Sequence, residues 1–137
     1  MPSTDNPNAP DNNGTTPIYC AAAKGHVEIV RLLMPSTDNP NAPDNNGRTP
    51  IHFAATYGHV EIVQLLIPST ENPNSPSNSG WTPIHWAAME GHVEIVRLLM
   101  ETTNNPNAPD INGRTPMSLA LQKGHQVIVK LFNAHNP

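Results

Sequence analysis

The chain has 137 residues, enough for one domain, with a formal net charge of −4 and only 13% charged residues. This balance argues against non-specific binding to nucleic acid or to an anionic membrane, since both need an excess of Lys and Arg. The sequence also lacks an apolar run of about 18 residues, so it predicts no membrane-spanning helix.

A period of 33 residues organises almost the whole sequence. Gly14, Gly47, Gly80 and Gly113 keep this step, as do the Thr-Pro and Gly-His pairs, and residues 2–13 recur letter for letter at 35–46. A unit of this length is too short to bury a core of its own, so it must stack on its neighbours. The period predicts a single domain over residues 1–137, built from a leading finger and four repeats: 1–13, then approximately 14–46, 47–79, 80–112 and 113–137.

Each repeat predicts the same order of elements, which is clearest in the second. Residues 35–47 are rich in Pro, Asn, Asp and Gly, and this composition predicts an extended turn segment. Thr49 is then expected to cap a short first helix, and Gly58 to end it in a left-handed conformation. The second helix follows His59 with a broad apolar stripe. The sequence therefore predicts a turn, a short helix, a tight turn and a longer helix in every repeat.

The segments TPIHFAATYGHVEIVQLLI (49–67) and TPIHWAAMEGHVEIVRLLM (82–100) resemble the ankyrin repeat, a 33-residue unit with a T-P-L-H-x-A signature. The resemblance covers essentially the whole chain. It implies an all-α solenoid of stacked helix-turn-helix pairs with projecting β-turn or hairpin fingers. It also implies a non-enzymatic module without cofactors, which binds a protein partner through its finger tips and the concave face of its first helices.

The chain departs from the family after its second helices. The family usually places Gly-Ala-Asp there, with the glycine in a left-handed cap, whereas this chain has Thr37, Thr70 and Thr103. Because a β-branched residue is poor at positive φ, we expect the helices to end earlier, at Pro35 and Pro68, with a different turn. Glu101 replaces proline in the next copy, so the helix there is expected to run longer.

The first and last copies are atypical, with TPIY and TPMS in place of TPIH, as expected of repeats that face water. Residues 1–13 complete no preceding helix pair, so we interpret the chain as an excised or engineered piece of a longer array. Uncapped end repeats expose core surface, and this predicts end-to-end self-association.

The sequence predicts neither a metal site nor a catalytic centre. His26, His59, His92 and His125 recur once per repeat, too far apart to share a zinc ion. His52 and His85 are instead expected to hydrogen-bond the Thr cap or neighbouring backbone. Cys20 is the only cysteine, which favours a reducing compartment such as the cytoplasm. A thiol or hydrolytic enzyme that uses Cys20 with His26 remains an alternative.

Positions that differ between copies are the candidates for partner recognition, because the shared packing does not dictate them. Aromatic residues with flanking arginines gather at these positions, and this is the composition of binding hot spots. The predicted partner-binding residues are Arg48, Phe53, Tyr57, Trp81, Trp86, Met89 and Arg114.

Two alternatives stay open. Phe53 and Trp86 lie on Ala-rich first helices, so they could merely cover the seams between repeats. The near-identity of the copies also fits an engineered or recently duplicated structural array with no dedicated partner. Whether the fingers pair as hairpins or stay extended is likewise left open by the sequence.

Overall fold

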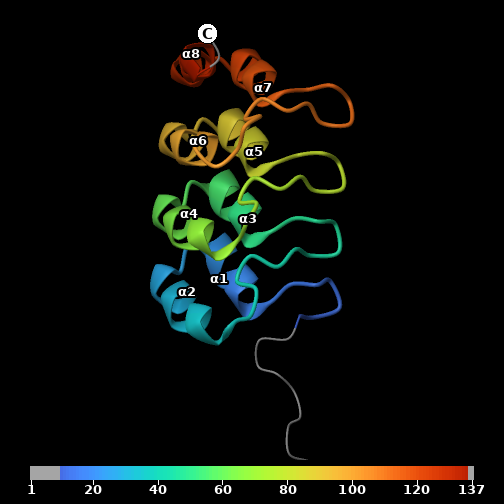
Figure 1. Ribbon diagram of the computed structural model, residues 1–137, viewed down its shortest axis with the longest axis vertical. Coiled ribbons are helices and arrows are strands. Elements are labelled where there is room, and N and C mark those ends of the chain that lie inside the picture. Colours follow the sequence, from blue (N-terminus) through green and yellow to red (C-terminus); the bar gives the residue numbers. More distant parts are fainter. Residues whose placement is uncertain (1–9, 136–137) are drawn as a thin grey trace, which may run out of the picture.

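The computed structural model describes residues 10–135, which form a stack of helix pairs (Figure 1). Second helices form one layer, first helices the middle layer, and fingers the third. The all-α stack predicted from the sequence is confirmed, and residues 10–135 contain no strand. The predicted leading finger lies outside the described residues over positions 1–9. The pairs are α1 (Pro17–Lys24) with α2 (Val27–Leu33), α3 (Pro50–Tyr57) with α4 (Val60–Leu66), α5 (Pro83–Glu90) with α6 (Val93–Met100), and α7 (Pro116–Lys123) with α8 (Gln126–His135).

Each first helix is bounded by the residues that the sequence indicated. In α3 the Thr49 hydroxyl accepts the backbone N–H of His52 at 3.3 Å, and Nδ1 of His52 accepts the backbone N–H of Thr49 at 2.9 Å. This reciprocal pair satisfies two N–H groups that a helix start leaves without partners. Gly58 then ends the helix in the left-handed region, at φ 77°.

The first two second helices end early, as predicted. α2 ends at Leu33 and α4 at Leu66, and Pro35 and Pro68 lie in the short 3-10 turns η1 (Met34–Ser36) and η2 (Ile67–Ser69). The threonines that follow are extended, and no non-glycine residue among the described ones has a positive φ. Where Glu101 replaces proline, α6 continues to Met100 and no such 3-10 turn follows.

The core is continuous along the stack because every repeat buries one face against each neighbour. Ile51, Ala54 and Ala55 of α3 are fully buried, and so are the apolar residues of α4 that face them. Small alanines let the first helices lie close together, since side-chain size sets the distance between packed helices.

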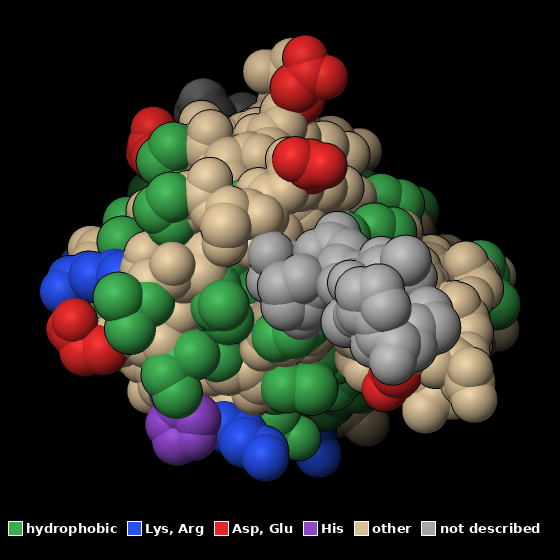
Figure 2. All heavy atoms as spheres, turned by 90° about the horizontal axis from the view of Figure 1, so that it is seen from below, with side chains coloured by type: hydrophobic (Ala, Val, Ile, Leu, Met, Phe, Trp, Pro, Cys, Tyr) green, Lys and Arg blue, Asp and Glu red, His purple; other side chains and the backbone are tan. Residues whose placement is uncertain are grey.

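The first repeat has a neighbour on one side only among the described residues. Ile29 is therefore 45% exposed, while its equivalents Ile62, Ile95 and Ile128 are fully buried. Figure 2 views this end of the stack and shows hydrophobic side chains spread over the face that is not covered by grey atoms.

Candidate partner-binding face

Each finger is a tight turn at the tip of a loop, and we number the fingers by these turns: finger 1 (11–15), finger 2 (44–48), finger 3 (77–81) and finger 4 (110–114). In finger 2 the carbonyl of Asp44 accepts the N–H of Gly47 at 3.0 Å, and the carbonyl of Arg48 accepts the N–H of Asp44 at 2.8 Å. Oδ1 of Asp44 also accepts the N–H groups of Asn46 and Arg48. The fingers are thus hydrogen-bonded hairpin turns, which answers the question that the sequence left open.

Hydrogen bonds also join each finger to the one before it. The backbone N–H groups of Asn45, Asn78 and Ile111 donate to carbonyls of the preceding fingers at 3.0, 2.9 and 3.2 Å. At the base of finger 2, Oδ1 of the buried Asn41 accepts the N–H of Ile51 in α3 at 3.0 Å. The fingers therefore have a fixed spacing and a fixed position relative to the first helices.

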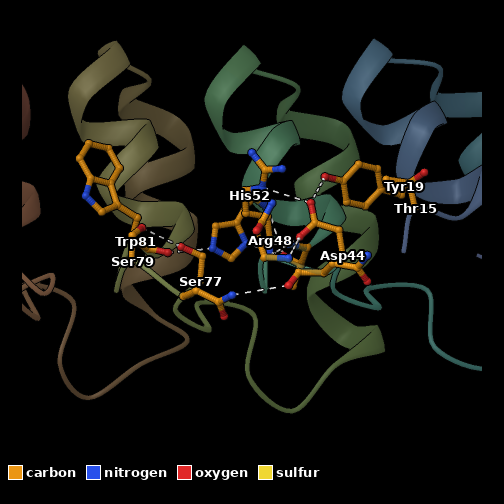
Figure 3. A network of polar contacts seen from close by, with 12 residues as sticks. Thr15, Tyr19, Asp44, Arg48, His52, Ser77, Ser79 and Trp81 are labelled. Carbon is orange, nitrogen blue, oxygen red and sulfur yellow. Dashed lines mark hydrogen bonds and ion pairs between the residues drawn. The ribbon is translucent and has the colours of Figure 1, made fainter. Parts of the chain in front are cut away.

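Two buried carboxylates accept hydrogen bonds from aromatic side chains that precede them in the chain. Oδ2 of Asp44 accepts the Tyr19 hydroxyl at 2.6 Å and Nε of Arg48 at 3.1 Å (Figure 3). Oδ2 of Asp110 accepts the indole N–H of Trp81 at 2.7 Å and Nε of Arg114 at 2.9 Å. In both cases the carboxylate of a finger accepts from an aromatic residue earlier in the chain and from the arginine of its own finger.

These carboxylates stay ionised because their donors outweigh burial. Burial by itself raises the pKa of Asp110, but the backbone N–H groups of Arg114 and Asn112, helped by the Trp81 indole, lower that pKa to about 2. The pKa of Asp44 is lowered against burial in the same way, chiefly by the Tyr19 hydroxyl. Burial and the hydrogen bond to Asp44 raise the pKa of Tyr19, which therefore remains a donor at neutral pH.

The structure corrects one expectation about the site. Trp81 does not stand free at a finger tip: it is only 8% exposed. Its ring lies 5.4 Å from the ring of His85 and 4.5 Å from that of Trp86, with the guanidinium carbon of Arg114 5.3 Å from its centroid. Ser77 stands where the other fingers have aspartate, and the indole N–H donates to Asp110 of the next finger. Trp81 thus positions neighbouring side chains and offers little surface of its own.

The remaining predicted residues keep open surface in two neighbouring groups. In the first, Phe53 is partly buried against Tyr19, with ring centroids 5.1 Å apart, and the guanidinium carbon of Arg48 lies 5.3 Å from its centroid. The ring centroid of Tyr57 lies 6.5 Å from that of Phe53, and Tyr57 is 58% exposed. Phe53 therefore covers a seam between repeats, as the alternative stated, and also presents part of its ring.

The second group surrounds Trp86 on α5. Trp86 and Met89 are partly buried and Arg114 is exposed. We define the finger–helix face as the accessible members of both groups: Arg48, Phe53, Tyr57, Trp86, Met89 and Arg114.

Sequence reasoning missed Ile111 at the tip of finger 4. This side chain is 73% exposed, whereas Asn45 and Asn78 occupy the same position in fingers 2 and 3 and donate their amides to the preceding finger. The signal was present in the sequence, because Ile111 is the only apolar residue in that column of the four copies.

His52 and His85 hydrogen-bond the Thr cap and neighbouring backbone, as predicted. His52 is buried, and its Nε2 lies 2.9 Å from the carbonyl oxygen of Trp81, so Nε2 must carry the proton. Burial lowers the pKa of His52 to about 4, which keeps the ring neutral, and it lowers the pKa of His85 as well. His92 contacts the Thr56 carbonyl of the preceding repeat at 3.0 Å.

Cys20 is exposed on α1. Across positions 10–135, no three His, Cys, Asp or Glu side chains converge as a metal site would require. Over the same range, no helix combines the length and apolar character needed to cross a membrane.

Comparison with known proteins identifies the family. The model of ankyrin repeats (3 copies) matches residues 3–77 and again residues 69–136. No curated protein matches the chain at a significant level. The chain belongs to the ankyrin-repeat family, whose members are generally protein–protein interaction modules and typically not enzymes.

Proposed function

We propose that this chain is a non-enzymatic module that binds a protein partner through the finger–helix face. The observation that carries the proposal is the exposure of Tyr57 and Arg114 beside the partly open rings of Phe53 and Trp86. Aromatic residues and arginine dominate the energetics of protein interfaces, because they offer large apolar area with few rotatable bonds.

The rigidity of this face supports the proposal. Phe53, Tyr57 and Trp86 lie on helices, and the arginines lie on fingers whose backbones are hydrogen-bonded to one another. Arg48 and Arg114 are further held by Asp44 and Asp110. A partner would therefore order few side chains on binding, and association would lose little entropy.

The test compares protein capture by the wild-type chain and by the double variant Tyr57→Ala, Trp86→Ala. Each chain is immobilised and then incubated with an extract of the organism that encodes it. Trp81 is left intact because it is buried. Gln64→Ala on α4, an exposed residue away from this face, is the matched control. We expect proteins retained by the wild type and by Gln64→Ala to be lost from the double variant, with helicity unchanged by circular dichroism. Equal capture by all three chains would exclude the proposed face.

The alternative, a structural array with no dedicated partner, is favoured by one observation: residues 2–13 and 35–46 are identical. It predicts that no protein is captured specifically. It also predicts that stability rises as repeats are added, because each new seam buries apolar surface.

A second copy of the chain is a further proposed partner, at the ends of the stack. Ile29 is exposed at one end, and Leu121 is exposed at the other, where Ala22, Ala55 and Ala88 are fully buried in the other repeats. Such apolar ends favour association at high concentration.

A further inference from the structure

The spaces between successive fingers are bridged by different side chains. Between fingers 1 and 2, the phenol of Tyr19 reaches Asp44; between fingers 3 and 4, the indole of Trp81 reaches Asp110. Between fingers 2 and 3, the residue at the position of Tyr19 is His52, whose Nε2 bonds to the backbone carbonyl of Trp81 in finger 3.

The aspartate that would receive a donor in this space is also replaced, by Ser77. A groove remains there, with residues of both fingers on its sides and an indole at the adjoining helix. We call it the finger 2–3 groove, lined by Asn46, Arg48, Ser77, Asn78, Ser79 and Trp86.

The lining of this groove carries one positive charge and no carboxylate, although the chain as a whole is acidic. Arg48 uses Nε for Asp44, and its side chain makes no other hydrogen bond within the described residues, so both Nη groups remain for a ligand. Asp44 lies behind the guanidinium with its side chain only 3% exposed. Because Asp44 also accepts the Tyr19 hydroxyl and two backbone N–H groups, Arg48 is not its only source of stabilisation.

The two serines add a donor at the same place. The hydroxyls of Ser77 and Ser79 lie 3.0 Å apart and share one hydrogen bond, so one of their two hydrogens is left to donate outward (Figure 3). Trp86 contributes partly exposed apolar surface beside them. A guanidinium, a hydroxyl donor and an indole together match a carboxylate that is attached to, or followed by, apolar groups.

We infer that the finger 2–3 groove receives an aspartate or glutamate side chain of the partner, with an apolar residue next to it on Trp86. This inference rests on the proposed function and names the chemistry of the partner segment. Arg48 supplies paired N–H donors and a positive charge that disfavours a cation, and the remaining serine hydrogen adds one more donor.

The experiment selects peptides from a displayed random library on the immobilised full chain. Selected sequences are then synthesised with amidated C-termini, so that a side chain is their only carboxylate, and titrated by calorimetry. The test variants are Arg48→Gln and Ser77→Asp. The second should fold, because Asp11, Asp44 and Asp110 stand at the same position in the other fingers. Arg97→Gln, on α6, removes an exposed charge away from the groove and is the control.

We expect the selected peptides to share an Asp or Glu beside an apolar residue. Their Kd should rise at least tenfold with Arg48→Gln and with Ser77→Asp, and less than twofold with Arg97→Gln. Replacing the acidic residue of the peptide by its amide should cost a similar factor, and that factor should shrink with added salt.

Three results would overturn the inference: no peptide is selected, the selected peptides lack carboxylates, or their affinity is unchanged by Arg48→Gln and Ser77→Asp. Peptides that ignore these changes but lose affinity with Tyr57→Ala and Trp86→Ala would overturn the groove alone and leave the proposed function standing. Peptides that are indifferent to all four changes would overturn both.

Discussion

The hydroxyl of Tyr19 donates a 2.6 Å hydrogen bond to Oδ2 of Asp44, and this bond joins the first helix pair to finger 2. In the next two repeats, histidine occupies the position of Tyr19 and bonds to backbone carbonyls of the following finger. One column of the repeat therefore links these neighbours, and the residue in it decides whether the link goes to a side chain or to the backbone of the following finger.

The link from Tyr19 should contribute measurably to stability. Tyr19→Phe removes a donor from an almost fully buried, ionised carboxylate, and we expect a loss of about 1–3 kcal/mol in the free energy of unfolding. Urea denaturation followed by circular dichroism measures it. Tyr57→Phe, at an exposed ring, is the control and should cost less than about 0.5 kcal/mol. Equal losses for the two variants would show that the hydrogen bond to Asp44 is not what holds finger 2.

Acid should destabilise the fold through His52. Its pKa is about 4 in the folded chain, against 6.5 for an ordinary histidine, mainly because the ring is buried. As the pH falls from 6.5 toward 4, the His52 ring therefore becomes protonated in the unfolded chain but stays neutral in the folded chain. The neutral ring contributes its full share of the free energy of unfolding above pH 6.5. This contribution, about 3 kcal/mol, is lost as the pH falls from 6.5 to 4.

The measurement for His52 is the free energy of unfolding at a series of pH values, for the wild type and for His52→Gln. We expect His52→Gln to be less stable at pH 7 but to lose less stability between pH 6.5 and 4. The remaining slope should come from His85, whose pKa burial also lowers. Identical slopes for the two chains would contradict the assignment.

Two glycines with the same backbone conformation separate local strain from packing between repeats. Gly58 and Gly124 both have φ of 77°, but a Cβ on Gly58 would lie 2.8 Å from Cε1 of His92, while one on Gly124 would have nothing within 4 Å. Gly124→Ala should cost about 1–2 kcal/mol, the penalty of an L-residue in the left-handed region. Gly58→Ala should cost at least about 1 kcal/mol more, because His92 must move away from the Thr56 carbonyl. Thermal and urea unfolding of both variants measure these two losses of stability. Equal losses would show that the contact between Gly58 and His92 is loosely packed.

Association through the ends of the stack should depend on concentration. We expect the mass measured by light scattering to rise above that of one chain as the concentration increases, because Ile29 and Leu121 are exposed at opposite ends. Ile29→Lys should reduce this rise, since it places a charge on the apolar end. Gln64→Lys, on the exposed surface of α4, should leave it unchanged. A mass that stays constant with concentration would remove the second copy from the proposed partners.

Much of the fold could be read from local signals that repeat every 33 residues. Thr49 and Gly58 bound their helix through hydrogen bonds and backbone conformations that depend on nearest neighbours in the chain. Pro35 and Pro68 end second helices for an equally local reason. Repetition strengthened each of these signals, because the same residues had to satisfy the same packing in every copy.

The candidate site was predicted less completely, because it depends on contacts between repeats. That Trp81 varies between copies was visible in the sequence, but its burial follows from an aspartate in the next finger and from the packing of His85 and Trp86 around its ring. The finger 2–3 groove likewise depends on contacts between repeats, because residues of two successive fingers line it. The sequence by itself determined the repeat, its helices and the positions free to vary. The tertiary structure alone decided which variable side chains reach solvent, because burial is set by residues about one repeat away that come together only when the units stack.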